Sequence, residues 1–116
     1  MEPSWNAFAD YFAAAFPHLR VAIEDEALTW SPEPHYFLGA YLLPELLTAA
    51  RTKKTTAVLH AAAVLEAVLT AKDQDLSEAA LHSVLKPLAD SVDCQCVFPQ
   101  LGPAAATMIR RLRVTT

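Results

Sequence analysis

The stretch AVLHAAAVLEAVLTAK, residues 57–72, decides the fold of this chain. Val58, Ala62, Leu65 and Leu69 recur at the spacing of one helical face, so they form a single apolar stripe. Alanine and leucine also lose little side-chain entropy when they enter a helix. The stretch therefore predicts a long helix whose stripe lies in the core.

The composition extends this prediction to the whole chain. Twenty-two of the 116 residues are alanine and only two are glycine, which favours helix over strand. Apolar residues make up 53% and charged residues 19%, a balance that excludes a disordered or collagen-like chain. A chain of this length can bury a core without disulfides, so we expect one all-α domain over residues 1–116.

The N-terminal segment predicts a first helix that begins after Ser4, whose hydroxyl can cap it, and ends before Pro17. Its apolar positions share one helical face and are expected in the core: Trp5, Phe8, Phe12 and Phe16. Residues 18–30 could hold a short strand or one helical turn at Arg20 to Ile23, which is too brief to assign, and we interpret them as a connection.

A second helix is predicted to start at Ser31, with Pro32 in its first turn and Glu33 favoured by the helix dipole. Pro44 lies too deep for that first turn, so it either kinks one long helix or opens a new one. Gly39 indicates a close contact between helices.

Two more helices are expected after the central one. Asp75 and Glu78 have the spacing of a capping box and predict a helix over 75–92, which Pro87 bends. Its inward-facing residues are expected to be Leu81, Val84, Leu85 and Leu88. Gly102 and Pro103 precede the last helix. About five helices result, arranged as an irregular bundle or as stacked helical hairpins of the HEAT-like kind.

Charge is distributed unevenly along the chain. Residues 1–48 hold seven acids against Arg20 alone, whereas residues 49–116 hold six acids and eight bases. An acidic half repels phosphate backbones and attracts basic protein surfaces, which favours a protein partner over nucleic acid. Because no stretch has the pattern of a signal peptide or a membrane span, we expect no membrane association and a cytoplasmic location.

Catalytic and metal-binding patterns are weak. Cys94 and Cys96 form a C-x-C pair with no later cysteine or histidine, unlike the paired ligands of structural zinc sites. The serines lie outside any strained nucleophile turn, and the chain lacks a glycine-rich phosphate loop. We therefore expect a protein that is not an enzyme and that holds no metal or cofactor.

The segment EDEALTWSPEPHY, residues 24–36, is the most unusual surface feature. A tryptophan beside a rim of acids has the composition of a binding hot spot for a basic partner. The partner-binding residues expected on this hypothesis are Glu24, Asp25, Glu26, Trp30, Glu33, His35 and Tyr36. The alternatives are that the acids are a solvated connector and that Trp30 covers the core.

Three segments carry a family resemblance: HYFLGAYLLPELLTAA (35–50), TAVLHAAAVLEAVL (56–69) and LGPAAATMIRRL (101–112). In this order they resemble small all-helical bacterial immunity proteins of polymorphic or secreted toxin systems, over about residues 34–112. The resemblance implies a non-catalytic protein that binds and neutralises one cognate protein toxin. It carries over no functional residues, because such interfaces diverge with their toxins.

Other function classes remain open at this point. A helical scaffold or regulator could bind an endogenous partner, or form a homodimer through its aromatic stripe. A small enzyme or metal-dependent sensor would use residues among His35, His60, His82, Cys94 and Cys96. Nucleic-acid binding is least favoured, since RTKK (51–54) and RRLR (110–113) are only small basic spots.

Overall fold

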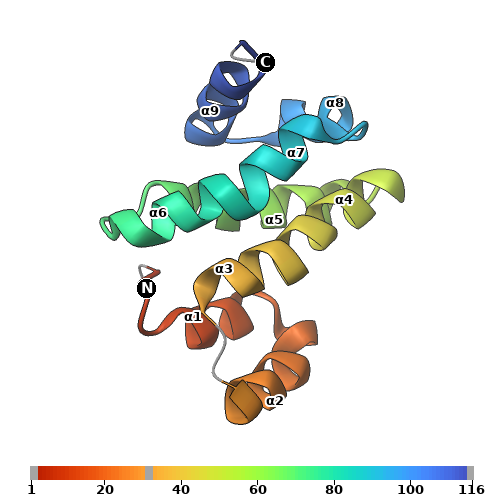
Figure 1. Cartoon of the computed structure of the whole chain (residues 1–116). Coiled ribbons are helices and arrows are strands. Elements are labelled where there is room, and N and C mark those ends of the chain that lie inside the picture. The colour runs from red at the N-terminus through yellow and green to blue at the C-terminus, as the bar shows by residue number, and fades with distance from the viewer. Residues whose placement is uncertain (1–2, 31–32, 115–116) are drawn as a thin grey trace.

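The structure, a computed structural model, describes residues 3–30 and 33–114, except for the side chains of residues 27–30 and 114. Figure 1 shows α1 and α2 at one end, α9 at the other, and the remaining helices stacked between them. In chain order the α-helices are α1 (Phe8–Ala15), α2 (Arg20–Trp30), α3 (Pro34–Phe37), α4 (Leu43–Arg51), α5 (Thr55–Leu69), α6 (Gln74–Ala80), α7 (Lys86–Asp90), α8 (Cys94–Val97) and α9 (Pro103–Val114).

The all-α prediction is confirmed, since the described chain is 82% helical and has no strands. The expected number of helices was too low. With each run of uninterrupted helix taken as one, the described residues form seven helices rather than about five. The additions are α2, in the segment expected to be a connection, and the short α8, in a segment expected to be irregular.

Both interior prolines follow a π-helical segment. The segment η2 (Leu38–Leu42) joins α3 to α4 ahead of Pro44, and η3 (Leu81–Leu85) joins α6 to α7 ahead of Pro87. Proline has no N–H for the regular helical bond and crowds the preceding turn, whereas a π turn relaxes that spacing. The two helices therefore continue through their prolines, as 34–51 and 74–90. They meet at Gly39, where an added Cβ would lie 3.7 Å from Ser83 Cβ, an ordinary contact.

Two predicted helix starts are shifted. The side chain of Asp73, not Asp75, caps α6 by accepting a hydrogen bond from the Leu76 amide at 3.3 Å. Asp73 is the cap because the helix begins at Gln74, and Asp75 therefore lies inside the first turn. After α2, the next helix begins at Pro34 with Glu33 as its cap, two residues later than the expected cap at Ser31. Ser31 and Pro32 lie outside the described residues.

An aromatic cluster joins the N-terminal helices to the rest of the core. Phe8, Phe12 and Phe16 are almost completely buried, and the Phe12 ring centroid lies 6.2 Å from that of Phe37 in α3. The predicted stripe is correct for these three residues and wrong for Trp5, which is only partly buried. Trp5 precedes the first residue of α1, so helical spacing does not apply to it.

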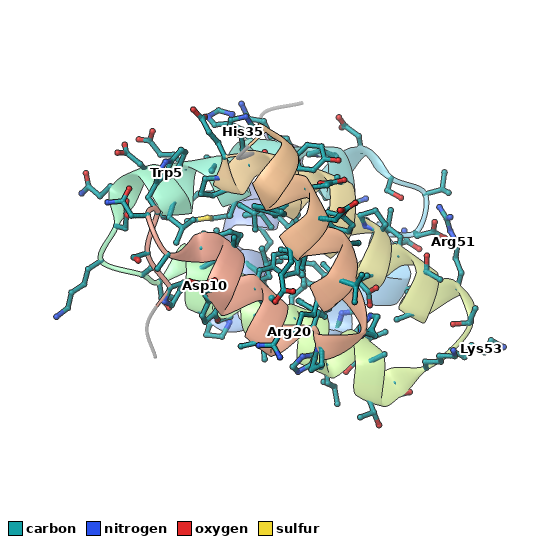
Figure 2. All side chains as sticks on the ribbon, turned by 90° about the horizontal axis from the view of Figure 1, so that it is seen from below. Trp5, Asp10, Arg20, His35, Arg51 and Lys53 are labelled. Carbon is teal, nitrogen blue, oxygen red and sulfur yellow. The ribbon has the colours of Figure 1, made fainter. Side chains whose placement is uncertain are left out.

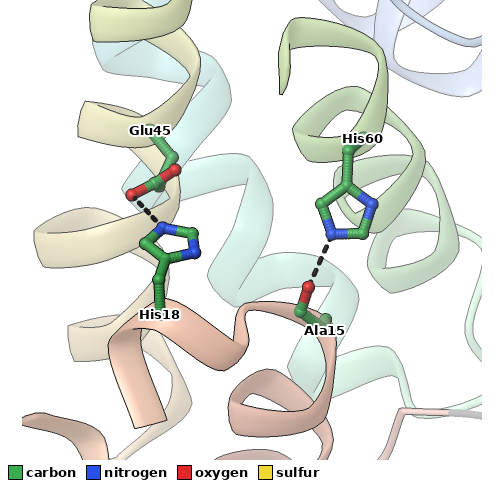
Figure 3. A network of polar contacts seen from close by, with 4 residues as sticks. All are labelled: Ala15, His18, Glu45 and His60. Atoms are coloured by element: carbon green, nitrogen blue, oxygen red, sulfur yellow. Dashed lines mark hydrogen bonds and ion pairs between the residues drawn. The ribbon is translucent and has the colours of Figure 1, made fainter. Parts of the chain in front are cut away.

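Two histidines attach the turn after α1 to the central helices (Figure 3). His60 of α5 donates from Nε2 to the carbonyl oxygen of Ala15 at 2.6 Å. His18 Nε2 lies 3.0 Å from Glu45 Oε1 of α4. Both histidines therefore connect one helix to another. Their partners lie far away in the sequence, and no local sequence pattern predicts them.

Helix α5 occupies the centre of the stack and carries its predicted stripe inward. Val58, Ala62, Leu65 and Leu69 are all buried, and α4, α6 and α9 all pack against this helix. For the helix of residues 74–90, Val84, Leu85 and Leu88 are buried as expected, whereas Leu81 is partly buried. In the part of the chain that is described, no helix has the length and apolar character to cross a membrane.

The carboxylate of Glu66 on α5 caps the start of α9. Its Oε2 accepts from the Ala104 amide at 2.8 Å and its Oε1 from the Ala105 amide at 3.1 Å. Gly102 makes the approach possible, because a Cβ at this position would lie 2.5 Å from Glu66 Cδ. A side chain from another helix thus satisfies amides that a local cap residue would ordinarily satisfy.

We expect Gly102→Ala to destabilise the fold by displacing Glu66, and Glu66→Ala to cost a similar amount, about 1–2 kcal/mol in the free energy of unfolding. The measurement is urea unfolding of both variants and of the double variant. Because both changes remove the same cap, adding Gly102→Ala to Glu66→Ala should cost little more. Additive losses would contradict a shared cause.

Candidate functional site

Three of the four acids of the predicted site lie on helix α2: Glu24, Asp25 and Glu26. Glu24 and Asp25 are exposed, and Glu24 pairs with Arg20 one turn earlier at 3.4 Å. Glu26 is partly buried on the side of α2 that faces α3 and η2, where its Oε1 accepts from the Tyr36 hydroxyl at 3.0 Å. The three neighbouring acids therefore have different surroundings, since two of them are exposed and the third is partly buried.

Glu26, Tyr36 and Tyr41 form a partly buried polar cluster. The other carboxylate oxygen, Oε2, is buried and accepts no hydrogen bond within the described residues. The hydrogen bond that the Tyr36 hydroxyl donates to Glu26 raises the pKa of Tyr36. Burial, followed by the Glu26 carboxylate, raises the pKa of Tyr41 from 10.0 to about 12. The hydrogen bond between Tyr36 and Glu26 links α2 to the long helix of residues 34–51, so both residues contribute to the fold.

The remaining predicted residues separate from this cluster. Glu33 and His35 lie next to each other, with Glu33 Oε2 at 3.4 Å from His35 Nδ1, and both are exposed. Trp30 ends α2, and its side chain lies outside the described residues. Among the predicted residues that the structure describes, it brings Glu26 to Tyr36 and Glu33 to His35.

His35 instead reaches a different aromatic residue, Trp5. The two ring centroids are 6.5 Å apart, and Figure 2 shows both side chains at the same edge of the molecule. The Trp5 backbone N–H donates to Asp73 Oδ2 at 2.9 Å, which holds the N-terminal segment against the start of α6. The side chain that caps α6 therefore also positions the tryptophan.

A hollow of about 430 Å³ opens beside this tryptophan. We call it the Trp5 hollow, and its lining residues come from the N-terminal segment, α3, α6 and η3: Trp5, His35, Asp75, Glu78, Ala79, His82 and Ser83. It combines an amphipathic ring, two carboxylates and two imidazoles. Such a surface suits a cationic or hydrogen-bonding group with a flat apolar face.

Only His35 of this lining was expected at the site. Trp5 was assigned to the core, and Asp75 to a capping box with Glu78. The sequence signal that could have placed Trp5 at the surface is its position between two polar residues, Ser4 and Asn6, at the end of the apolar stripe. The acids Asp75 and Glu78 are 70 or more residues away in the chain, so only tertiary packing brings them to Trp5.

Two further cavities have mixed linings. One of about 410 Å³ lies between the turn after α1 and the helices α4 and α5, where Tyr41, Lys54 and the His18–Glu45 pair face it. The other, of about 260 Å³, includes Lys53 and Cys96. Because His18 and Glu45 already bind each other across two helices, their contact has a structural use.

The thiols and histidines named as alternative ligands do not converge. Among the described residues, no three His, Cys, Asp or Glu side chains are grouped as metal ligands would be. Cys94 is buried, which raises the pKa of its thiol, whereas Cys96 is exposed. The two cysteines therefore have different surroundings although one residue separates them.

Comparison with known proteins finds no family model, no curated protein and no solved structure that matches this chain.

The pKa of Tyr41 predicts a loss of stability at alkaline pH. The folded state holds the phenolic proton more tightly than the unfolded chain, so the contribution is complete below about pH 10 and is lost as the pH rises towards about 12. Glu26→Gln should lower the Tyr41 pKa part of the way back, as measured by tyrosinate absorbance with Tyr41→Phe used for assignment. Glu24→Gln, on the exposed side of the same helix, is the matched control. A native Tyr41 that titrates near 10.0 would show that the cluster is absent.

Proposed function

We propose that this protein is an immunity protein, which binds a cognate secreted bacterial toxin and neutralises it by protein–protein inhibition, without catalysis, in the cytoplasm of the producing cell. The observation that carries the proposal is the Trp5 hollow, in which a partly buried indole lies beside Asp75 and Glu78. Aromatic anchors with charged neighbours are typical of the residues that dominate binding energy at protein interfaces.

Charge supports a basic partner. Asp75, Glu78 and Glu33 are exposed acids around or next to the hollow, and Glu24 and Asp25 add exposed acids on α2. A toxin that acts on nucleic acid or nucleotides needs a basic cleft, and an acidic inhibitor can enter such a cleft and exclude the substrate. The same charge disfavours nucleic acid as a direct partner.

The chain order also supports this role. The resemblance to helical immunity proteins covers residues 34–112, which contain α3 to α8 and most of α9. We further propose that these helices pair as stacked hairpins of the HEAT-like kind, because α4 packs on α5 and α5 packs on α6 along the stack. On this proposal the N-terminal segment adds Trp5 to a surface that the hairpins provide.

A scaffold that dimerises through its aromatic stripe is less well supported. Phe8, Phe12 and Phe16 are buried inside the chain, where Phe8 and Phe12 contact Phe37 of α3 and Phe16 contacts His60 of α5, so they offer no free face to a second copy. A homodimer would need another surface, and the large apolar side chains that are exposed among the described residues come from three different segments: Val21, Leu59 and Val92.

The proposal is tested by recovering the partner of the tagged protein from its own cells and expressing that partner in a naive host. We expect a protein that is lethal alone and harmless when this chain is co-expressed. Asp75→Lys with Glu78→Lys should weaken binding by about 100-fold or more, because both changes put like charge against a basic cleft.

The matched control is Asp10→Lys with Asp90→Lys, two exposed acids outside the hollow that make the same change in net charge. This variant should keep most of its protection. Circular dichroism checks that each variant folds. A partner that is harmless alone would overturn the function, whereas equal losses in both variants would overturn the assignment of the surface.

A further inference from the structure

We propose that the Trp5 hollow takes one arginine side chain of the partner, with the guanidinium stacked on the Trp5 indole and bound by the carboxylates of Asp75 and Glu78. The inference rests on the proposed function only for the identity of the partner. The chemistry of the subsite stands on the geometry of the hollow.

The two carboxylates are available for a ligand. Within residues 3–30 and 33–114, neither Asp75 nor Glu78 has a hydrogen bond or an ion pair, and both are exposed. By contrast, Asp73 beside them binds both the Leu76 amide and the Trp5 amide. Asp73 thus serves the fold next to the hollow, whereas the two carboxylates that line the hollow, Asp75 and Glu78, remain available for a ligand.

The ring of Trp5 is positioned before any ligand arrives. Its backbone is held by Asp73 at 2.9 Å, and its ring lies 6.5 Å from the His35 ring at an interplanar angle of 46°. An anchored indole loses little entropy on binding, and tryptophan offers the best aromatic face for a cation. Ala79 and Ser83 are small, so they leave space beside the ring.

Arginine fits this arrangement better than lysine. A guanidinium is planar, so it can stack on the indole while its N–H groups donate in different directions along its edge. Asp75 and Glu78 are separated by nearly one helical turn on α6, so each carboxylate can accept a hydrogen bond from a different N–H group of the guanidinium. A lysine ammonium is a single point charge that would be shared between acids and would lose the stacking contact.

The probe is N-acetyl-arginine amide, titrated into the isotope-labelled full chain and followed by amide and indole N–H shifts in NMR spectra. N-acetyl-citrulline amide has nearly the same shape without the charge and is the matched ligand control. We expect saturable shifts at the Trp5 indole and at residues 75–83 with arginine in the millimolar range, and at most one-tenth of that affinity with citrulline.

Protein variants sharpen the test. Asp75→Asn and Glu78→Gln should each weaken arginine binding by about five- to tenfold, the range that corresponds to roughly 1 kcal/mol for one lost charge contact. Asp90→Asn, an exposed acid on α7, should leave the affinity unchanged. Trp5→Leu should remove the preference for arginine over lysine, in a protein whose dispersed spectrum shows that it remains folded.

Equal affinity for arginine and citrulline, shifts confined to α2, or no shifts at all would each overturn the subsite. The two proposals fail separately. If arginine binds the hollow and the natural partner is not toxic, the function is wrong and the subsite stands. If a toxin is bound and neutralised by a chain whose hollow ignores arginine, the subsite is wrong and the function stands.

Discussion

Burial of α5 is the constraint on which the rest of this structure depends. Its apolar residues lie on more than one face, so the helix needs α4, α6 and α9 around it to leave water. Glu66 is the acid on this helix, and it is satisfied by the first amides of α9 rather than by water or a cation. Helix α5 therefore organises the core and also positions the C-terminal helix. Position 102 requires glycine because the Glu66 carboxylate occupies the space of a side chain there.

The two long helices adapt to α5 through their prolines. Each contains a π segment followed by a proline, and the π segments contact each other where the helices cross. A proline inside a regular helix would leave a carbonyl group without its donor and crowd it. The π turns redistribute these bonds over residues that are already bending. The helix of residues 34–51 also packs against α1, because Phe37 contacts Phe12.

The resulting surface has two acidic regions with different uses. On α2, Glu26 supports the tyrosine cluster, and Glu24 and Asp25 remain exposed. At the start of α6, Asp73 supports the fold, and Asp75 and Glu78 line the Trp5 hollow. In Figure 2, Trp5 lies at the upper left of the molecule and Arg51 and Lys53 lie at the right, where Arg51 forms an ion pair with Asp93 at 2.8 Å.

The sequence by itself determined the helical class, the stripe of α5 and the start of α9, because alanine content, helical spacing and a Gly-Pro pair are local properties. It did not reveal α2, whose described core residue is Ile23 alone, because that helix is stabilised by packing and by the cluster around Glu26. Only the tertiary structure decided that Trp5 belongs to a hollow with Asp75 and Glu78, since the helix that would have turned it inward begins at Phe8. Contacts such as Trp5 with Asp73 or Glu66 with Ala104 join residues far apart in the chain, and no local pattern specifies which distant group will satisfy a polar atom.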